Sequence, residues 1–330
     1  MRRRWLVPIG RLVILVGFCA WLIERGYLSL FALETASALW PWVLAGWAAT
    51  ATATLIAIVR WHFLMSTQDL EVPFRRTLAI ALIGTFFSVV LPGTMSGDLV
   101  KGFYITRLTP GRGEKAVSTI LFDRILGVSG LILLACISLA IVAFRGVWAD
   151  SLGRSLQFAI GASGLCVIAF FAALLGVAEE RDPILAVLRR GAEKHRIIYS
   201  IHKVFEGIRV YHRQRLVTLC GLVASVGIHA LMVTAWLCYI RAMSLEGIPG
   251  AALFVVVPAA LLVAALPIAP AGIGTGHAAF LAVFALLGSS HGADLYNLAM
   301  VYLLLQGAVG GLIYLTVRSH EPAPTADTPS

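Results

Sequence analysis

The sequence has little charge and no stretch that resembles a large water-soluble domain. Asp, Glu, Lys and Arg make up only 13% of its 330 residues, against roughly 25% in soluble domains. Hydrophobic residues make up 59%. The apolar segments are long and lack the alternation that marks the strands of a membrane barrel. We therefore expect an all-α polytopic membrane protein.

The sequence also lacks the patterns that mark metal sites, cofactors and catalytic groups. Its five cysteines fall inside apolar segments without metal-ligand spacing, so we expect neither a metal site nor a disulfide framework. No nucleotide-binding GxxxxGKS or GxxxxGKT motif and no Ser-His-Asp set is present. We predict no cofactor and no catalytic residue. An integral-membrane enzyme stays an alternative, because carboxylates inside a membrane can perform lipid chemistry.

Six segments are long enough to cross a bilayer, at about 20 residues each. They form a single transmembrane domain over residues 1–318, which includes two shorter segments that are broken by proline and glycine. A polar, proline-rich tail at 319–330 is expected to be disordered. The six predicted spans are 5–23, 40–59, 125–144, 156–177, 216–240 and 295–317, and the two broken segments are about 78–104 and 251–287.

The basic residues are distributed unevenly around these segments. If six spans cross and both broken segments re-enter, 21 of the 26 Lys and Arg residues lie on one side. Cytoplasmic loops of membrane proteins are enriched in Lys and Arg. We therefore expect the protein to lie in the inner membrane, with both termini in the cytoplasm. The broken segments then enter from opposite faces, as inverted-topology repeats do in transporters. The basic residues on the cytoplasmic side account for the net charge of +9, so we expect no nucleic-acid partner.

One sizeable polar segment, 178–215, carries apolar residues at helical spacing. Basic residues and histidines lie between them, which is typical of an amphipathic helix. Such a helix either lies on the anionic inner leaflet or packs on the bundle as an ordinary cytoplasmic helix. The apolar residues are Ile198, Ile201, Phe205 and Ile208.

The first broken segment contains the stretch FFSVVLPGTMSGDLVK, which ends at Lys101. Pro92, Gly93 and Gly97 interrupt an apolar run there, and Asp98 follows at once. A broken helix at membrane depth is tolerated only where it is buried in protein or lines a cavity. Asp98 either caps a short helix or helps Lys101 and the helix start to form a place for a phosphate.

The second broken segment, LPIAPAGIGTGH, has the same opening, with Pro267 followed by a glycine five residues later. Gly272, Gly274 and Gly276 permit either the close approach of an anion to backbone N–H groups or tight helix crossing. We expect a helix to begin near residue 275. His277, which ends the motif, is either a hydrogen-bonded structural histidine or a proton carrier.

Asp123 and Arg124 stand at the predicted entrance of the third span. Adjacent residues on a helix point about 100° apart, so these two cannot pair with each other. If the first break packs here, Arg124 meets Asp98 and Asp123 meets Lys101. Alternatively, both are interfacial charges at a helix entrance. His229 is expected to form a hydrogen bond with Ser225, one turn earlier.

The motifs LPGTMSGDLVKGFY, FDRILG and LPIAPAGIGTGH occur in this order over some 200 residues. Together with Arg60-Trp61, they resemble the flippase-like membrane domain of lysylphosphatidylglycerol synthases and its stand-alone relatives. The resemblance implies a helical domain with two re-entrant elements that moves a lipid head group between leaflets. Lys101 and His277 stand where that family often has Arg and Glu. The separate aminoacyl-transferase domain of the synthases has no counterpart here.

These observations predict a translocase in which both breaks bind the phosphate of a lipid head group. The alternatives are an enzyme that acts on a lipid-linked phosphate and a non-transporting scaffold in envelope-lipid synthesis. The expected partners are membrane lipids, of phospholipid, polyprenyl-linked or hopanoid type, with a second copy or a lipid-biosynthesis enzyme as further candidates. The predicted binding residues are Pro92, Gly93, Gly97, Asp98, Lys101, Asp123, Arg124, Pro267, Gly272, Gly274, Gly276 and His277.

Overall fold

The computed structural model describes residues 38–91, 96–144, 154–176, 182, 185, 187–189, 196–266, 272 and 274–319. Within these residues the chain is helical and has no strand. The predicted first span, both prolines of the breaks, Gly93 and the tail at 320–330 lie outside the described residues. The helices are α3 (Trp40–Ser66), α4 (Phe74–Val90), α5 (Ser96–Leu108), α6 (Gly113–Phe144), α7 (Arg154–Gly176), α9 (Arg196–Arg213), α10 (Arg215–Ala242), α11 (Gly250–Ala264), α12 (Thr275–Ala285) and α13 (Gly292–Ser319).

Five of these helices are long and apolar enough to cross a membrane: α3, α6, α7, α10 and α13. They correspond to five of the six predicted spans, which confirms the all-α, multi-pass class. One boundary differs from the prediction. Helix α6 begins at Gly113 rather than near residue 125. Asp123 and Arg124 therefore lie about 15 Å inside this helix, at about 1.5 Å per residue, and not at its entrance.

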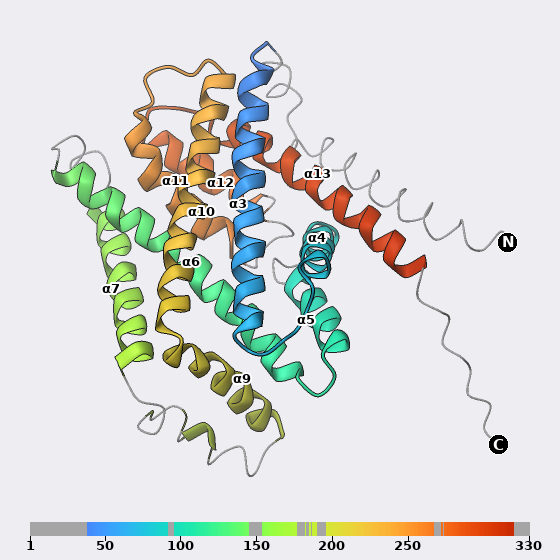
Figure 1. Ribbon diagram of the computed structural model, residues 1–330. Coiled ribbons are helices and arrows are strands. Elements are labelled where there is room, and N and C mark those ends of the chain that lie inside the picture. Colours follow the sequence, from blue (N-terminus) through green and yellow to red (C-terminus); the bar gives the residue numbers. More distant parts are fainter. Residues whose placement is uncertain are drawn as a thin grey trace, which may run out of the picture.

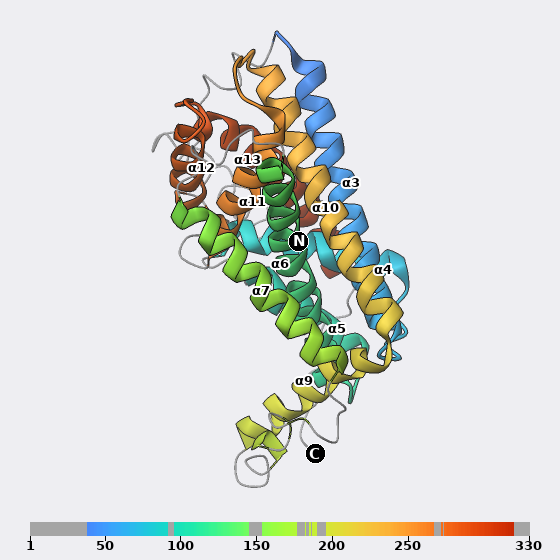
Figure 2. The same ribbon diagram turned by 90° about the vertical axis from the view of Figure 1, so that its left-hand side faces the viewer.

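Helices α3 and α10 lie side by side along most of their length, and α6 crosses behind them (Figure 1). Figure 2 shows α7 alongside α6 on the outer side of the bundle. The largest buried cluster joins α10 to α11, α12 and α13. At its centre Trp236 stacks on Phe280, with ring centroids 3.9 Å apart. This packing holds α11 and α12 against the long helices α10 and α13.

Each broken segment folds as two short helices, α4 with α5 and α11 with α12. Helix α4 ends at Leu91, whose ψ of 145° is extended, as expected of a residue that precedes a proline. The α4–α5 pair lies nearer the end of the bundle where α3 ends, and the α11–α12 pair nearer the end where α3 begins (Figures 1 and 2). That placement agrees with entry from opposite faces, although re-entry itself stays a prediction.

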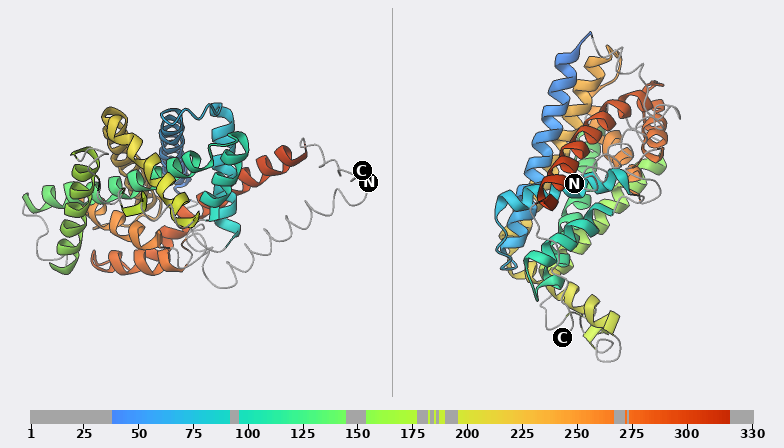
Figure 3. Two further views of the ribbon diagram at one scale, coloured as in Figure 1. Left: turned by 90° about the horizontal axis from the view of Figure 1, so that it is seen from below. Right: turned by 90° about the vertical axis from the view of Figure 1, so that its right-hand side faces the viewer.

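Helix α9 lies at one end of the bundle and packs against α6, α7 and α10 (Figure 3). Its Tyr211 is fully buried, stacks on Phe122 with centroids 4.0 Å apart, and donates a hydrogen bond to the carbonyl of Leu64. Burial raises the pKa of Tyr211 to about 12. These contacts support the helix packed on the bundle. Tyr199 and Ile201, near the start of α9, are about half exposed.

Candidate functional site

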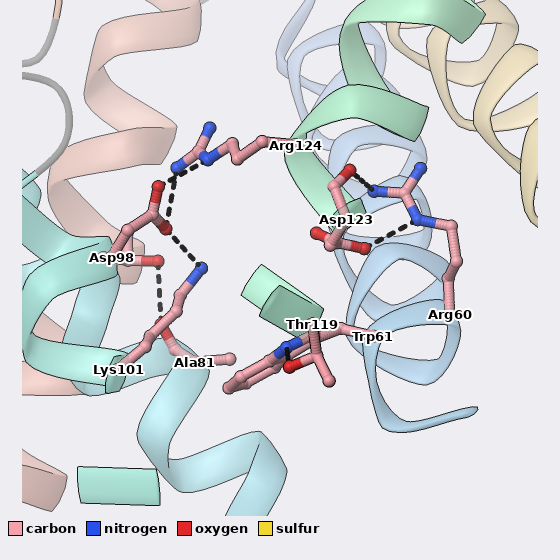
Figure 4. A network of polar contacts seen from close by, with 9 residues as sticks. Arg60, Trp61, Ala81, Asp98, Lys101, Thr119, Asp123 and Arg124 are labelled. Carbon is pink, nitrogen blue, oxygen red and sulfur yellow. Dashed lines mark hydrogen bonds and ion pairs between the residues drawn. The ribbon is translucent and has the colours of Figure 1, made fainter. Parts of the chain in front are cut away.

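Two basic side chains converge on one carboxylate where α5 meets α6 (Figure 4). Arg124 donates from Nε and Nη2 to the two oxygens of Asp98, at 2.6 and 3.0 Å. Lys101 Nζ lies 3.3 Å from the same carboxylate. The predicted pairing of Arg124 with Asp98 is therefore confirmed. We call Asp98, Lys101 and Arg124 the charged triad.

The start of α5 holds Asp98 in place through its contact with α4. Gly97 lies against α4, and a Cβ atom there would overlap the carbonyl oxygen of Gly84 and the hydroxyl of Ser88. Asp98 itself is in the first turn of α5, where the helix dipole favours a negative charge. The close approach of Gly97 is thus an approach to another helix, so its side-chain direction offers no space for a ligand.

The partner of Asp123 differs from the prediction. Asp123 pairs with Arg60 of α3, whose Nε lies 2.9 Å from Oδ1, and it does not pair with Lys101. Arg60 also donates to the backbone carbonyl of Asp123 and to the hydroxyl of Ser225 in α10. The prediction failed because it ended the second span at residue 59 and so left Arg60 outside the membrane. We call Arg60, Asp123 and Ser225 the Arg60 network.

Arg60 is a functional candidate that sequence reasoning misplaced. It is only 9% exposed, and α3 continues beyond it to Ser66. The signal was present in the sequence, because buried apolar residues follow Arg60 at positions that continue one helix face. These are Trp61, Leu64 and Met65. A charge followed by such a pattern lies inside a helix, where it needs a partner.

Trp61 lies between the charged triad and the Arg60 network, as Figure 4 shows. Its indole N–H lies 3.3 Å from the hydroxyl oxygen of Thr119 on α6. Its ring faces Lys101, with Nζ 5.5 Å from the ring centroid. A cation at this distance is attracted by the ring quadrupole. The ring of Trp61 therefore contacts Lys101 and limits the positions that its ammonium group can take.

The second broken segment carries a different polar arrangement. The backbone N–H of Gly274 donates to His277 Nδ1 at 3.2 Å, and His277 Nε2 lies 3.0 Å from Oδ1 of Asn297 on α13. An Nδ1 that accepts a hydrogen bond leaves Nε2 to donate to Asn297. The structure thus favours the hydrogen-bonded histidine. Helix α12 begins at Thr275, as expected.

Two glycines of this segment face protein in the direction of their missing side chains. A Cβ at Gly276 would overlap the ring of Tyr296, and one at Gly272 would lie 2.9 Å from the carbonyl oxygen of Ala264. Gly272 and Gly274 have φ of 74° and 84°, a conformation that favours glycine. These features explain the glycines by packing and backbone geometry. An anion nest here stays a prediction.

His229 does not form the predicted bond with Ser225. Its Nε2 contacts the carbonyl oxygen of Gly127 on α6 at 2.9 Å. The hydroxyl of Ser225 instead donates to the carbonyl of Gly221 and accepts from Arg60. The prediction considered only the helix that carries His229. In the structure, the Ser225 hydroxyl accepts a hydrogen bond from Arg60, the buried arginine of the neighbouring helix α3.

The electrostatic balance of the site is positive. The Arg60–Asp123 pair is neutral, whereas the charged triad has two positive groups and one negative group. Asp98 and Lys101 are largely enclosed, but the Arg124 side chain is 52% exposed. Within the described residues, no group of three or more His, Cys, Asp or Glu is arranged to hold a metal ion. The exposed guanidinium group of Arg124 can offer charge and hydrogen bonds to a small anion.

Arg124 opens toward an apolar surface. Exposed apolar residues share its face of α6, at spacings of three and four residues along the helix: Val117, Leu121 and Val128. The adjacent helix α5 exposes Leu99 and Phe103. In a membrane, such faces lie against lipid. Arg124 therefore opens onto an apolar face formed by α5 and α6.

These features define a multi-pass helical membrane protein with a cluster of charged residues between α5 and α6. The model of one family, the lysylphosphatidylglycerol synthase TM region, matches residues 9–311. The chain belongs to this family, as its motifs predicted. No curated protein and no solved structure matches it. Membership in the family points to a function connected with membrane lipids.

Proposed function

We propose that this protein moves a phosphate-bearing lipid head group between the two leaflets of the membrane. The observation that carries the proposal is the charged triad, in which one carboxylate holds two bases and one base, Arg124, is half exposed beside apolar residues of α5 and α6. The triad has a formal charge of +1, so a ligand with one negative charge makes the site neutral. A phosphodiester head group carries that charge.

Binding is an exchange of partners. The phosphate takes the two N–H groups of Arg124 from Asp98, and Lys101 remains with Asp98. Each positive group then has one negative partner, so no charge is left uncompensated in a region of low dielectric, where such a charge is costly. Release reverses the exchange, because the Asp98 carboxylate competes for Arg124. A transporter has to release its lipid and therefore needs this competition. A protein that only binds an anion tightly does not.

The finer architecture belongs to the same proposal. Six spans, the first of them at 5–23, carry two re-entrant segments that enter from opposite faces of the inner membrane, with both termini in the cytoplasm. The two breaks, at 92–95 and 267–271, lie outside the described residues, and their part in binding the head group stays a prediction. Membrane lipids are the partners, and a second copy or a lipid-biosynthesis enzyme can accompany them.

The test uses purified protein in liposomes with a head-group-labelled anionic phospholipid in one leaflet. We expect movement of the label across the bilayer without release of phosphate and without a new lipid species. Arg124→Gln should slow this movement at least about tenfold, since it removes the charged fork. Arg107→Gln is the matched control, because Arg107 is an exposed base on α5 that stacks on Phe103.

Three results would contradict the proposal. Release of phosphate by the wild-type protein would indicate an enzyme. Movement no faster than in empty liposomes, at normal protein levels, would favour the scaffold. Equal rates for Arg124→Gln, Arg107→Gln and wild type would show that the charged triad is not the binding site.

A further inference from the structure

We infer that Arg60 and Trp61 of α3 are positioning residues that hold the two bases of the charged triad, Arg60 through α6 and Trp61 by direct contact. This role rests on the proposed function, since it concerns the orientation of an anion-binding site. The two residues are adjacent in the sequence and both are buried, at 9% and 3% exposure. Neither is among the residues that the sequence motifs predicted to bind a ligand.

Arg60 fixes the rotation of α6. Its guanidinium group donates to the side chain and backbone carbonyl of Asp123 and to the hydroxyl of Ser225. The planar fork of an arginine satisfies three such acceptors in only one orientation, and a lysine cannot reproduce it. Helices α3, α6 and α10 are therefore held in one mutual arrangement at this level.

The rotation of α6 decides where Arg124 points, because Arg124 follows Asp123 directly. Side chains reach about 5 Å or more from a helix axis, so a rotation of about 20° moves such an atom by about 2 Å. A shift of that size breaks a hydrogen bond, which weakens steeply beyond its usual length. Arg124 bonds to Asp98 at 2.6 Å, so this contact depends on the rotation that Arg60 fixes.

Trp61 acts on the other base. Its ring lies 5.5 Å from Lys101 Nζ, and its indole N–H is held by Thr119 of α6. When an anion takes Arg124 from Asp98, the Trp61 ring still confines Lys101 beside that carboxylate. The bonds that the anion exchanges are all within the charged triad, and those of the Arg60 network are left intact.

The test replaces the buried ion pair by apolar residues in the double variant Arg60→Met/Asp123→Leu. A single substitution leaves a buried charge without its partner and disrupts the fold, whereas the apolar pair is commonly tolerated. We expect normal protein levels and thermal stability, but movement of labelled anionic lipid at least about tenfold slower, since small errors of placement are costly at such sites. If the ion pair has a purely structural role, the double variant should regain both the stability and the lipid movement that a single substitution loses.

A second measurement is independent of transport. Spin labels at Phe103→Cys on α5 and Val223→Cys on α10, both exposed positions, report the placement of α5 in a background without the five native cysteines. We expect one narrow distance distribution in the wild type and a broad one in the double variant. Arg209→Met/Asp182→Leu is the matched control, because it removes another buried ion pair, with side chains 3% and 9% exposed. That control should keep the narrow distribution.

The outcomes separate the two claims. A double variant with a narrow distribution and normal movement overturns the positioning role, and so does a narrow distribution with lost movement. A broad distribution, in a protein whose wild type moves no lipid, supports the positioning role and refutes the proposed function. For Trp61 we expect Trp61→Phe, which keeps a ring beside Lys101, to retain most of the movement that Trp61→Leu loses. Equal rates for these two variants would show that the contact of the Trp61 ring with Lys101 does not contribute to lipid movement.

Discussion

Replacement of Asp98 by asparagine separates a carboxylate that competes with a ligand from one that only caps a helix. The change keeps the shape of the side chain and removes one negative charge, so the formal charge of the triad rises from +1 to +2. Arg124 and Lys101 lose their ionic partner at 2.6 and 3.3 Å. We expect Asp98→Asn to bind an anionic lipid more tightly than the wild type and to move it more slowly.

The size of the effect follows from the geometry. A hydrogen bond to a charged group contributes about 1.5–3 kcal/mol when buried, but Arg124 is 52% exposed, so solvent and head groups screen its share. We therefore expect the variant to lose only about 1–2 kcal/mol of stability and to fold. Removal of a unit charge near a bound anion changes affinity by at least about 1.4 kcal/mol, which corresponds to tenfold tighter binding and, if release limits transport, tenfold slower movement.

The assay compares lipid binding and movement in liposomes for Asp98→Asn and Asp69→Asn. Asp69 is the matched control, because its side chain is 82% exposed and it lies 3.9 Å from Lys115 in a loop contact. We expect Asp69→Asn to stay within about twofold of the wild type, as surface ion pairs contribute little. Movement by Asp98→Asn at the wild-type rate, or weaker binding of the anionic lipid, would refute the competition and leave helix capping as the role of Asp98.

Two further predictions concern packing and topology. Gly97→Val should destabilise the purified protein by about 1–3 kcal/mol and so lower its thermal midpoint. The reason is that a valine side chain at position 97 overlaps α4. Gly161→Val, at a position in α7 with no neighbouring atom within 4 Å, should not lower the midpoint, and equal midpoints would contradict the Gly84–Gly97 contact. In a cysteine-free background, Pro110→Cys should react with a membrane-impermeant reagent only from the cytoplasmic side and Glu246→Cys only from outside, both positions being exposed. Reaction of both from the same side would contradict the inverted arrangement.

The spans were predictable because hydrophobic length is a strong signal in a membrane protein. Five predicted segments correspond to helices with ends within a few residues of the prediction, apart from the start of α6 and the end of α3. Both exceptions have the same cause. Each helix continues past the apolar stretch into a segment that carries charges, 113–124 in α6 and Arg60 in α3. A search for uncharged runs ends a helix at its first charge, although the backbone continues wherever that charge finds a partner.

The candidate site was predictable only in part, because sequence spacing shows which residues share a helix but not which helices are neighbours. Arg124 and Asp98 were paired correctly, since only the α5–α6 contact was needed. The prediction pairs Asp123 with Lys101 because the span predicted at 40–59 leaves Arg60 outside the membrane. Once Arg60 is seen as a buried charge, it requires a carboxylate in a neighbouring helix. Asp123, turned about 100° away from Arg124 on the same helix, is the carboxylate that faces it.

This division of partners has a functional consequence. Had Asp123 paired with Lys101, the four charges would have formed two neutral pairs between α5 and α6, with no excess charge to attract an anion. Because Arg60 takes Asp123, the two bases of the triad share a single carboxylate, and Arg124 keeps a half-exposed face. By pairing with Asp123, the buried arginine of α3 leaves the charged triad with its net positive charge, although Arg60 is not part of the triad. In Arg60→Met/Asp123→Leu that charge is unchanged, so a loss of movement in the double variant reports lost orientation rather than lost attraction.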